Sequence, residues 1–330
     1  MKLFSFTSRQ HSGIGLCVQS NYYDLQRLRP TLPTSMLELC MQGEAAWQAL
    51  VELNQFIIDH PKDEGVSASR IDLDAGYTLL APLPNPSSVR DAYAFRQHVE
   101  TSRRNRGLEM IPTFDEIPVF YFSNHRAVTG PGSIACMPLH LNQLDFELEV
   151  AVVIKKKGRN ISPEEADEYI AGFMIMNDWS ARALQMQEMQ LNLGPAKGKD
   201  FSTSFGPYLV TPDELAEYQV PPPEGHVGTC YRLEMKAVVN GEEVSKGWLN
   251  EMHWTFAEII SRASYGVDLY PGDVIGSGTV GTGCFLELNG TGKFLNPEGF
   301  VEQWLLPGDQ ISLSVTGLGE LKNEIIVAES

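Results

Sequence analysis

Cysteines are few in this sequence, and they show no pairing pattern. The five are odd in number, widely spaced and without a C-x-x-C motif: Cys17, Cys40, Cys136, Cys230 and Cys284. A disulfide framework usually has an even number of cysteines, and a structural zinc site usually has closely spaced pairs. The sequence therefore indicates reduced thiols and predicts a cytoplasmic location.

Basic residues are scarce as well. Lysine and arginine together number 25, against 42 aspartates and glutamates, so the formal net charge of the 330-residue chain is −17. A surface of this sign repels nucleic-acid phosphates and anionic lipids, and we expect neither nucleic acid nor membrane as a partner. We also expect no secretory signal, and the sequence has no apolar run long enough to span a membrane. An anionic substrate would need local basic residues or a metal ion.

The sequence also lacks a Walker-type phosphate-binding loop. Residues 193–207 (LGPAKGKDFSTSFGP) are rich in glycine and serine, but Lys199 is followed by Asp200, where the motif requires serine or threonine. We therefore do not expect nucleotide binding. The loop can still wrap its backbone and Lys199 around a small anionic ligand.

The chain length predicts two domains of unequal size. A chain of 330 residues can bury a large core and usually divides into more than one domain. The proline-rich segment at residues 82–88 (PLPNPSS) is the clearest boundary. We place a small β-rich domain at residues 1–84, with helical periodicity at residues 35–58, and a larger domain at residues 85–330.

An acidic segment in the larger domain has the period of a strand. In residues 145–154 (DFELEVAVVI) apolar residues alternate with Asp145, Glu147 and Glu149, which predicts a strand with three acids on one face. Neighbouring carboxylates repel one another. The face is either a solvated acidic surface or the binding site of a hard divalent cation, which prefers oxygen ligands.

Another candidate segment precedes this strand. It contains Asp91 and His98, seven residues apart, a spacing that would place both on one face of a helix. Arg103, Arg104 and Arg106 follow. This basic run is either a solvated surface or a site that attracts a carboxylate substrate.

Capping patterns predict two further helices. Residues 162–165 (SPEE) have the pattern of a helix start, which predicts a helix through ADEYIAGF and then a buried strand that ends near Asp178. A similar start stands at residues 211–214 (TPDE).

The last hundred residues are predicted to be all-β apart from one short helix. A two-residue hairpin turn is indicated at Asn240-Gly241, and a short helix at residues 254–264. A glycine-rich loop then carries Thr279 and precedes Glu287. Such loops often only let two backbones pass closely, so the loop by itself indicates no activity.

Four motifs, in this order and spacing, resemble the fumarylacetoacetate hydrolase family: DFELEVA, NDWSAR, GPAKGKDF and SGT…LEL. The resemblance covers residues 80–326 and implies a two-domain member. It implies a mainly β, α+β fold, in which a mixed β-sandwich or β-roll catalytic domain follows a small N-terminal β-rich domain. The family resemblance also implies a homodimer and a divalent ion held by carboxylates, with Mg²⁺ expected and Mn²⁺ or Ca²⁺ as alternatives.

The resemblance assigns roles to individual residues. The metal ligands it implies are Asp91, Glu147, Glu149 and Asp178. The catalytic residues are His98, Glu287 as the group that orients it, and Lys199 beside the oxyanion. The substrate-binding residues are Tyr93, Tyr121, Arg182, Gln185 and Thr279. One position departs from the family pattern, because Met189 stands near where fumarylacetoacetate hydrolases have a tyrosine that contacts the substrate.

The implied reaction is the hydrolysis of a carbon–carbon bond in a small anionic β-diketo or 2-oxo acid. The metal would stabilise an enolate, and His98 would activate water, since imidazole can accept a proton near neutral pH. A decarboxylase, isomerase or hydratase of 2-oxo acids would use the same metal site. A non-catalytic metal-binding module is the third reading, and it leaves His98, Lys199 and Arg182 without a role.

Overall fold

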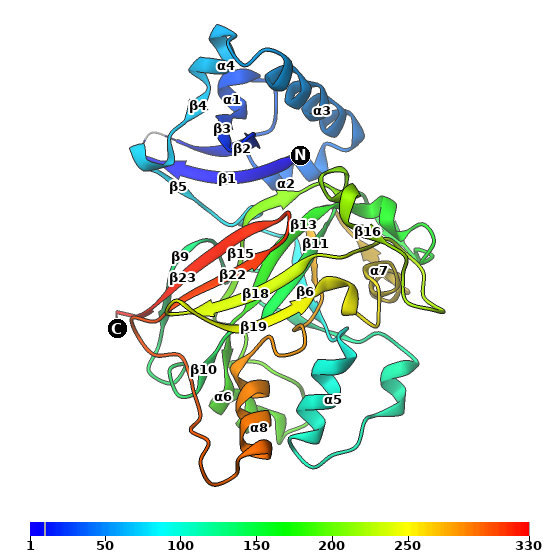
Figure 1. Ribbon diagram of the computed structural model, residues 1–330. Coiled ribbons are helices and arrows are strands. Elements are labelled where there is room, and N and C mark those ends of the chain that lie inside the picture. Colours follow the sequence, from blue (N-terminus) through cyan, green and yellow to red (C-terminus); the bar gives the residue numbers. More distant parts are fainter. Residues whose placement is uncertain (10, 330) are drawn as a thin grey trace.

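The computed structural model of the protein describes residues 1–9 and 11–329. Figure 1 shows an N-terminal unit at one end of the molecule, two stacked sheets in the middle and three helices at the opposite end. Within the described residues, no helix combines the length and the apolar character needed to cross a membrane. The expected mainly β, α+β architecture is confirmed.

The N-terminal unit combines short strands with a layer of helices. Its strands are β1 (Lys2–Ser8), β2 (Ser12–Val18), β3 (Asn21–Asp24), β4 (Arg70–Ile71) and β5 (Tyr77–Leu79), and its helices are α1 (Leu25–Leu28), α2 (Met36–Met41), α3 (Glu44–Asp59) and α4 (Glu64–Ala68). The helical period predicted at residues 35–58 is divided between α2 and α3. The division falls at Gly43, whose φ of +73° is a backbone conformation that ends a helix.

The main sheet runs through the whole molecule. Its principal strand order is β4-β3-β2-β1-β15-β13-β11-β21-β6-β7, with β5 on β1 and β8 on β15. The strands not yet placed are β6 (Ser88–Ala92), β7 (Phe120–Ser123), β8 (Val128–Thr129), β11 (Leu148–Ile154), β13 (Ile170–Asp178), β15 (Thr203–Val210) and β21 (Asp273–Gly276). Because β1 pairs with β15, the sheet crosses the boundary predicted between residues 84 and 85.

A second sheet packs on one face of the main sheet. It has the order β19-β18-β22-β23-β9, with strands β9 (Gly132–Cys136), β18 (Glu234–Val239), β19 (Glu242–Trp248), β22 (Gln310–Val315) and β23 (Gly319–Val327). The hairpin predicted at Asn240-Gly241 joins β18 to β19. In Figure 1 the yellow to red strands β18, β19, β22 and β23 of this sheet lie in front of the main sheet, and together the two sheets form the sandwich.

Strand β11 is covered on both faces. Val150 and Val152 belong to the core between the two sheets, whereas Ala151 and Val153 belong to the core under the N-terminal helices. The strand is therefore buried along its length, and the solvated acidic surface, one of the two alternatives for this segment, is wrong. Apolar and acidic residues alternate only up to Glu149, and every residue from Val150 to Ile154 is apolar.

Three helices gather at the end of the sandwich that carries the polar residues. They are α5 (Arg96–Arg104), α6 (Arg182–Met189) and α8 (Phe285–Leu295), at the lower end of Figure 1. Helix α8 contradicts the expectation of β-structure there. It begins where two backbone amides, Phe285 N and Leu286 N, find a buried acceptor in Asp145, a partner remote in the sequence. The short helix expected at residues 254–264 is confirmed as α7 (Phe256–Ser264).

The two capped helices predicted at residues 162 and 211 are only short 3₁₀ helices. They are η3 (Ala166–Tyr169) and η4 (Pro212–Tyr218). The Ser162 hydroxyl bonds to the Glu165 side chain and does not cap a backbone amide. From Ile170 the apolar residues enter β13, because a strand with both faces covered buries them more completely than a surface helix.

The remaining elements are short connections. Three two-stranded pairs join β10 (Leu144–Asp145) to β14 (Ser180–Ala181), β12 (Gly158–Arg159) to β20 (Asp268–Leu269), and β16 (Gln219–Val220) to β17 (Cys230–Tyr231). Three further 3₁₀ turns are η1 (Leu73–Ala75), η2 (Pro112–Asp115) and η5 (Leu249–Glu251).

Candidate functional site

Four carboxylates meet at one end of neighbouring strands. Asp91 lies on β6, Glu149 on β11 and Asp178 at the end of β13, and Glu147 directly precedes β11. Strands β6, β21, β11 and β13 are adjacent in the main sheet, so these side chains converge although they are far apart in the sequence. One carboxylate oxygen from each residue lies within 4.8 Å of the oxygens of the other three. All four residues are buried, and the most exposed of them, Glu147, is 6% exposed.

The donor atoms of this cluster fit a divalent cation. Glu149 Oε2 and Asp178 Oδ1 are buried and have no hydrogen-bond partner among the described residues. A buried carboxylate oxygen without a partner is unfavourable, and a hard cation with oxygen ligands would satisfy it. Gly276 leaves the space open, since a Cβ atom there would lie 2.5 Å from Asp91 Oδ1 and 3.1 Å from Glu149 Oε2. The assignment of the four residues as metal ligands stays a prediction.

Burial and mutual repulsion perturb these carboxylates. Burial, reinforced by Asp178, raises the pKa of Asp91 to about 8. Burial and the charge of Asp91 raise the pKa of Glu149 well above its ordinary value. Without a cation, these two carboxyl groups therefore favour their protonated forms, whereas a metal-binding site needs charged oxygens. A bound ion would compete with those protons.

Lys199 neutralises one side of the cluster. Its Nζ lies 2.5 Å from Glu147 Oε2 and 2.7 Å from Asp178 Oδ2. Burial alone would raise the pKa of Glu147, but Lys199 and Arg182 lower it to about 2. Lys199 was predicted to lie beside an oxyanion, and the structure places its ammonium group against two predicted metal ligands. An ammonium group has three hydrogens, so one remains for a substrate in the cavity that Lys199 lines.

Arg182 connects the cluster to a carboxylate whose role the sequence did not reveal. Its Nη2 lies 2.8 Å from both Glu147 Oε1 and Asp145 Oδ2, and its Nη1 donates to Gln185 Oε1 at 2.9 Å. Asp145 also accepts the backbone amides of Phe285 at 2.7 Å and Leu286 at 2.9 Å, the first residues of α8. The predicted face of three adjacent acids is therefore wrong for Asp145, which lies on β10 and holds Arg182 and α8 in place. Its alternation with Glu147 and Glu149 concealed this role.

A histidine and a glutamate form a buried pair beside the carboxylates. His98 Nδ1 lies 2.6 Å from Glu287 Oε2, which also accepts the amide of Thr282 at 3.0 Å. His98 comes from α5 and Glu287 from α8, two helices that pack together. The predicted helix with Asp91 and His98 on one face is wrong, because Asp91 lies on β6 and the helix begins only at Arg96. With Nδ1 bound to Glu287, Nε2 is the nitrogen that remains for a ligand.

The predicted residues surround one cavity of about 660 Å³. Nine of them line it: Asp91, Tyr93, His98, Tyr121, Glu147, Arg182, Gln185, Lys199 and Thr279. The other three lie directly behind the wall, where Glu149 accepts a hydrogen bond from Thr279, Asp178 from Tyr121, and Glu287 bonds to His98.

The cavity is also lined by side chains to which the sequence assigned no role. They include Val119, Phe120, Met186, Leu286 and Trp304, and Met189 joins them at the position that departs from the family pattern. Apolar residues have no chemical signature in a sequence, so only their position in the fold reveals them. Of the basic run, Arg106 alone lines the cavity, whereas the Arg104 guanidinium lies 5.3 Å over the Phe294 ring.

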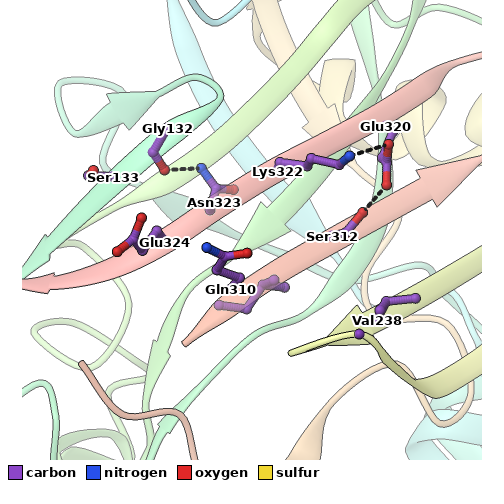
Figure 2. Close-up of a pocket in the computed structure, with 11 residues that line it drawn as sticks. Gly132, Ser133, Val238, Gln310, Ser312, Glu320, Lys322, Asn323 and Glu324 are labelled. Atoms are coloured by element: carbon purple, nitrogen blue, oxygen red, sulfur yellow. Dashed lines mark hydrogen bonds and ion pairs between the residues drawn. The ribbon is translucent and has the colours of Figure 1, made fainter. Parts of the chain in front are cut away.

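A second cavity, of about 480 Å³, lies on the five-stranded sheet. Figure 2 shows the polar residues that line it on β22 and β23, where Lys322 lies 2.9 Å from Glu320 and the buried Asn323 donates to Gly132 O at 3.0 Å. The charged residues here, Glu320, Lys322 and Glu324, are exposed, and the first two form an ion pair. This surface lacks the buried titratable groups of the first cavity, which is therefore the candidate active site.

Comparison with known proteins agrees with the presence of an active site. A family model for the fumarylacetoacetate (FAA) hydrolase C-terminal region matches residues 87–326. The chain is 30% identical over 298 residues to the oxaloacetate tautomerase YisK of Bacillus subtilis, covering 89% of this chain and 87% of that protein. It is 28% identical over 331 residues to the mitochondrial oxaloacetate tautomerase FAHD2A of Bos taurus, covering 99% of this chain and 92% of that protein. The solved structure of a fumarylacetoacetate hydrolase from Exiguobacterium antarcticum is similar with a TM-score of 0.68 at 25% identity, covering 99% of each chain.

Proposed function

The chain belongs to the fumarylacetoacetate hydrolase family of enzymes, and we propose that it is a metal-dependent hydrolase of a carbon–carbon bond in a β-diketo 2-oxo acid. The observation that carries the proposal is the buried His98–Glu287 pair, at 2.6 Å, beside four converging carboxylates in one cavity. An ion that only stabilised the fold would need the four carboxylates and no histidine pair. The histidine pair adds a group that can move a proton.

Each residue of the site has a distinct role in the proposed reaction. A divalent ion held by Asp91, Glu147, Glu149 and Asp178 would supply Lewis acidity to the oxygens of the 2-oxo acid and so favour its enolate. Glu287 holds the Nδ1 proton of His98, which leaves Nε2 to accept a proton from the attacking water. Water adds to the distal carbonyl, the carbon–carbon bond breaks to release a carboxylic acid, and the departing enolate takes up the proton. Arg182 positions Gln185, and Lys199 donates to the developing negative charge.

Oxaloacetate tautomerase is the second candidate function. It is favoured by the relatives with that name, one of which is 30% identical over 89% of this chain. Tautomerisation would use the same residues, but His98 would move a proton on carbon and no water would attack. The cavity of about 660 Å³ also has room for substrates larger than a four-carbon acid.

A substrate panel distinguishes the two candidates. The protein is stripped of metal, reloaded with Mg²⁺ or Mn²⁺, and offered acetylpyruvate, fumarylacetoacetate and the enol form of oxaloacetate, with products identified by NMR. We expect metal-dependent release of pyruvate and a carboxylic acid from an acylpyruvate. Accelerated enol-to-keto conversion of oxaloacetate without cleavage would support the second candidate. Metal binding without turnover on the whole panel would support a non-catalytic module.

Variants test the role of His98. His98→Ala is expected to lose hydrolysis and to retain metal binding, measured by calorimetry with Mn²⁺. His60→Ala is the matched control, because His60 is an exposed histidine of the N-terminal unit. Wild-type turnover in His98→Ala would refute the proposal. The expected homodimer is a separate proposal, which light scattering of the purified protein tests.

A further inference from the structure

A second group of metal-ligating side chains lies beside the carboxylate cluster. It consists of His98, Cys284 and Glu287, and one ligand atom from each lies within 4.8 Å of the other two. The three residues are 5%, 0% and 2% exposed. The group therefore brings an imidazole, a thiol and a carboxylate together in a buried position beside the substrate cavity.

The fold holds this group in place without a ligand. Cys284 is the N-cap residue of α8 and Glu287 lies in its first turn, so one helix start supplies two of the three side chains. The preceding turn is closed by a hydrogen bond of 2.8 Å from Gly283 N to Val280 O, and Gly283 O accepts the amide of Leu148, the first residue of β11, at 2.9 Å. Glu287 is further held by the Thr282 amide. His98 approaches from α5, the helix packed against α8.

The donor atoms of the two groups select different metals. The four carboxylates offer oxygen only, which suits hard ions such as Mg²⁺ and Mn²⁺. Nitrogen, sulfur and oxygen donors together suit Zn²⁺, which commonly binds three protein side chains and leaves one position for another ligand. Cys284 takes no part in the reaction proposed above and does not line the substrate cavity. The proposed reaction therefore gives no reason for a thiol at this position.

We propose that His98, Cys284 and Glu287 form a second metal site, selective for Zn²⁺, whose occupation inhibits the enzyme. Because His98 lines the cavity, the ion can reach the site from there. Binding at His98 Nδ1 breaks its hydrogen bond to Glu287, and the imidazole then carries its proton on Nε2. The thiol proton of Cys284 leaves to solvent. A histidine protonated at Nε2 cannot accept the proton of the attacking water.

The inhibitory part of this inference rests on the proposed function, whereas metal binding at the site does not. Burial raises the pKa of the Cys284 thiol well above its ordinary value, so the metal-free protein holds an unreactive thiol there. Thiol oxidation is therefore a poor alternative use of this cysteine. The neighbouring nitrogen and oxygen donors of His98 and Glu287 instead favour displacement of the thiol proton by a borderline cation such as Zn²⁺.

Cobalt and zinc spectroscopy test the site directly. The protein is first saturated with Mg²⁺ to occupy the carboxylate cluster, and one equivalent of Co²⁺ is then added. We expect a thiolate-to-cobalt charge-transfer band in the near ultraviolet, which Cys284→Ser abolishes and Cys136→Ser retains. Cys136 is the matched control, because it is equally buried but belongs to the core of the sandwich. X-ray absorption of the zinc-loaded wild-type protein should show one sulfur ligand at about 2.3 Å.

Inhibition is measured in parallel on the magnesium enzyme. Cys284→Ser should keep the basal rate and should weaken inhibition by Zn²⁺ by at least ~100-fold, since loss of a direct ligand exceeds the ~10–100-fold effect of an indirect one. Zinc bound through oxygen alone, or a charge-transfer band unchanged in Cys284→Ser, would overturn the proposal. If Cys284→Ser fails to fold, the wild-type absorption spectrum still decides. If no substrate is turned over, the proposed function fails, whereas the spectroscopic test of the site remains valid.

Discussion

A single methyl group at Gly276 should disable the carboxylate cluster without changing any charge. Gly276 ends β21, between the strands that carry Asp91 and Glu149. The Cβ of an alanine there would lie 2.5 Å from Asp91 Oδ1, 2.7 Å from Met176 Sδ and 3.1 Å from Glu149 Oε2. The φ angle of Gly276 is not positive, so the backbone itself accepts alanine. Any effect of Gly276→Ala therefore comes from the lost space.

The size of the effect follows from these distances. Ordinary contacts of a Cβ atom begin at 3.4 Å, so Asp91 must recede by 3.4 − 2.5 = 0.9 Å. Overpacking of a buried site costs about 1–3 kcal/mol, which corresponds to a loss of about 5- to 150-fold in metal affinity if the strain falls on the bound state. A displacement of about 1 Å in a reacting group can also lower the rate by about 10²-fold. We therefore expect weaker metal binding and slower turnover together.

Calorimetry with Mn²⁺ measures the affinity, and thermal denaturation with and without metal checks that the variant folds. Gly65→Ala is the matched control, because Gly65 is exposed in α4, and a new Cβ there meets only Asp63 Oδ1, at 3.2 Å. The control should bind Mn²⁺ with wild-type affinity. A folded Gly276→Ala protein with wild-type Mn²⁺ affinity would refute the reasoning, because the ion would then not require the space between Asp91 and Glu149.

Three further predictions concern the charges of the site. The pKa of Asp91 is raised from 3.8 to about 8, so its protonated form stabilises the metal-free protein at low pH, and that contribution is lost as the pH rises from about 4 to about 8. Thermal denaturation with a chelator should show this decline and Mg²⁺ should reduce it, and a metal-free protein that is more stable at pH 8 than at pH 5 would contradict it. Lys199→Met leaves Asp178 without its buried cation and Glu147 with Arg182 alone, and it should lower the free energy of unfolding of the metal-free protein by about 3–5 kcal/mol, measured with urea. A loss below about 1 kcal/mol would show that the ion pairs contribute little. Glu287→Gln should lower turnover by about 10²–10⁴-fold with unchanged Mn²⁺ affinity, and wild-type kinetics would rule out its orienting role.

Much of the candidate site could be predicted from the sequence. The motifs around Glu147, Asp178 and Lys199 combine residue types and spacings that few other sites need, and the resemblance they carry extended to His98 and Glu287. The main β-architecture could also be predicted, because hairpin and strand periods depend on neighbours in the chain. These predictions depend on local patterns, which a sequence displays directly.

Only the tertiary structure decided which of these residues meet and what surrounds them. The acidic strand proved to be buried on both faces, because helices from residues 36–59 cover one face and the second sheet covers the other. Helix α8 formed where a β-structure was predicted, because Asp145, more than a hundred residues earlier, accepts its first amides. Gly276 and Cys284 were unremarkable in the sequence and lie against the two candidate groups of ligands. Distances between residues remote in the chain depend on the packing of the whole core, and no local pattern records them.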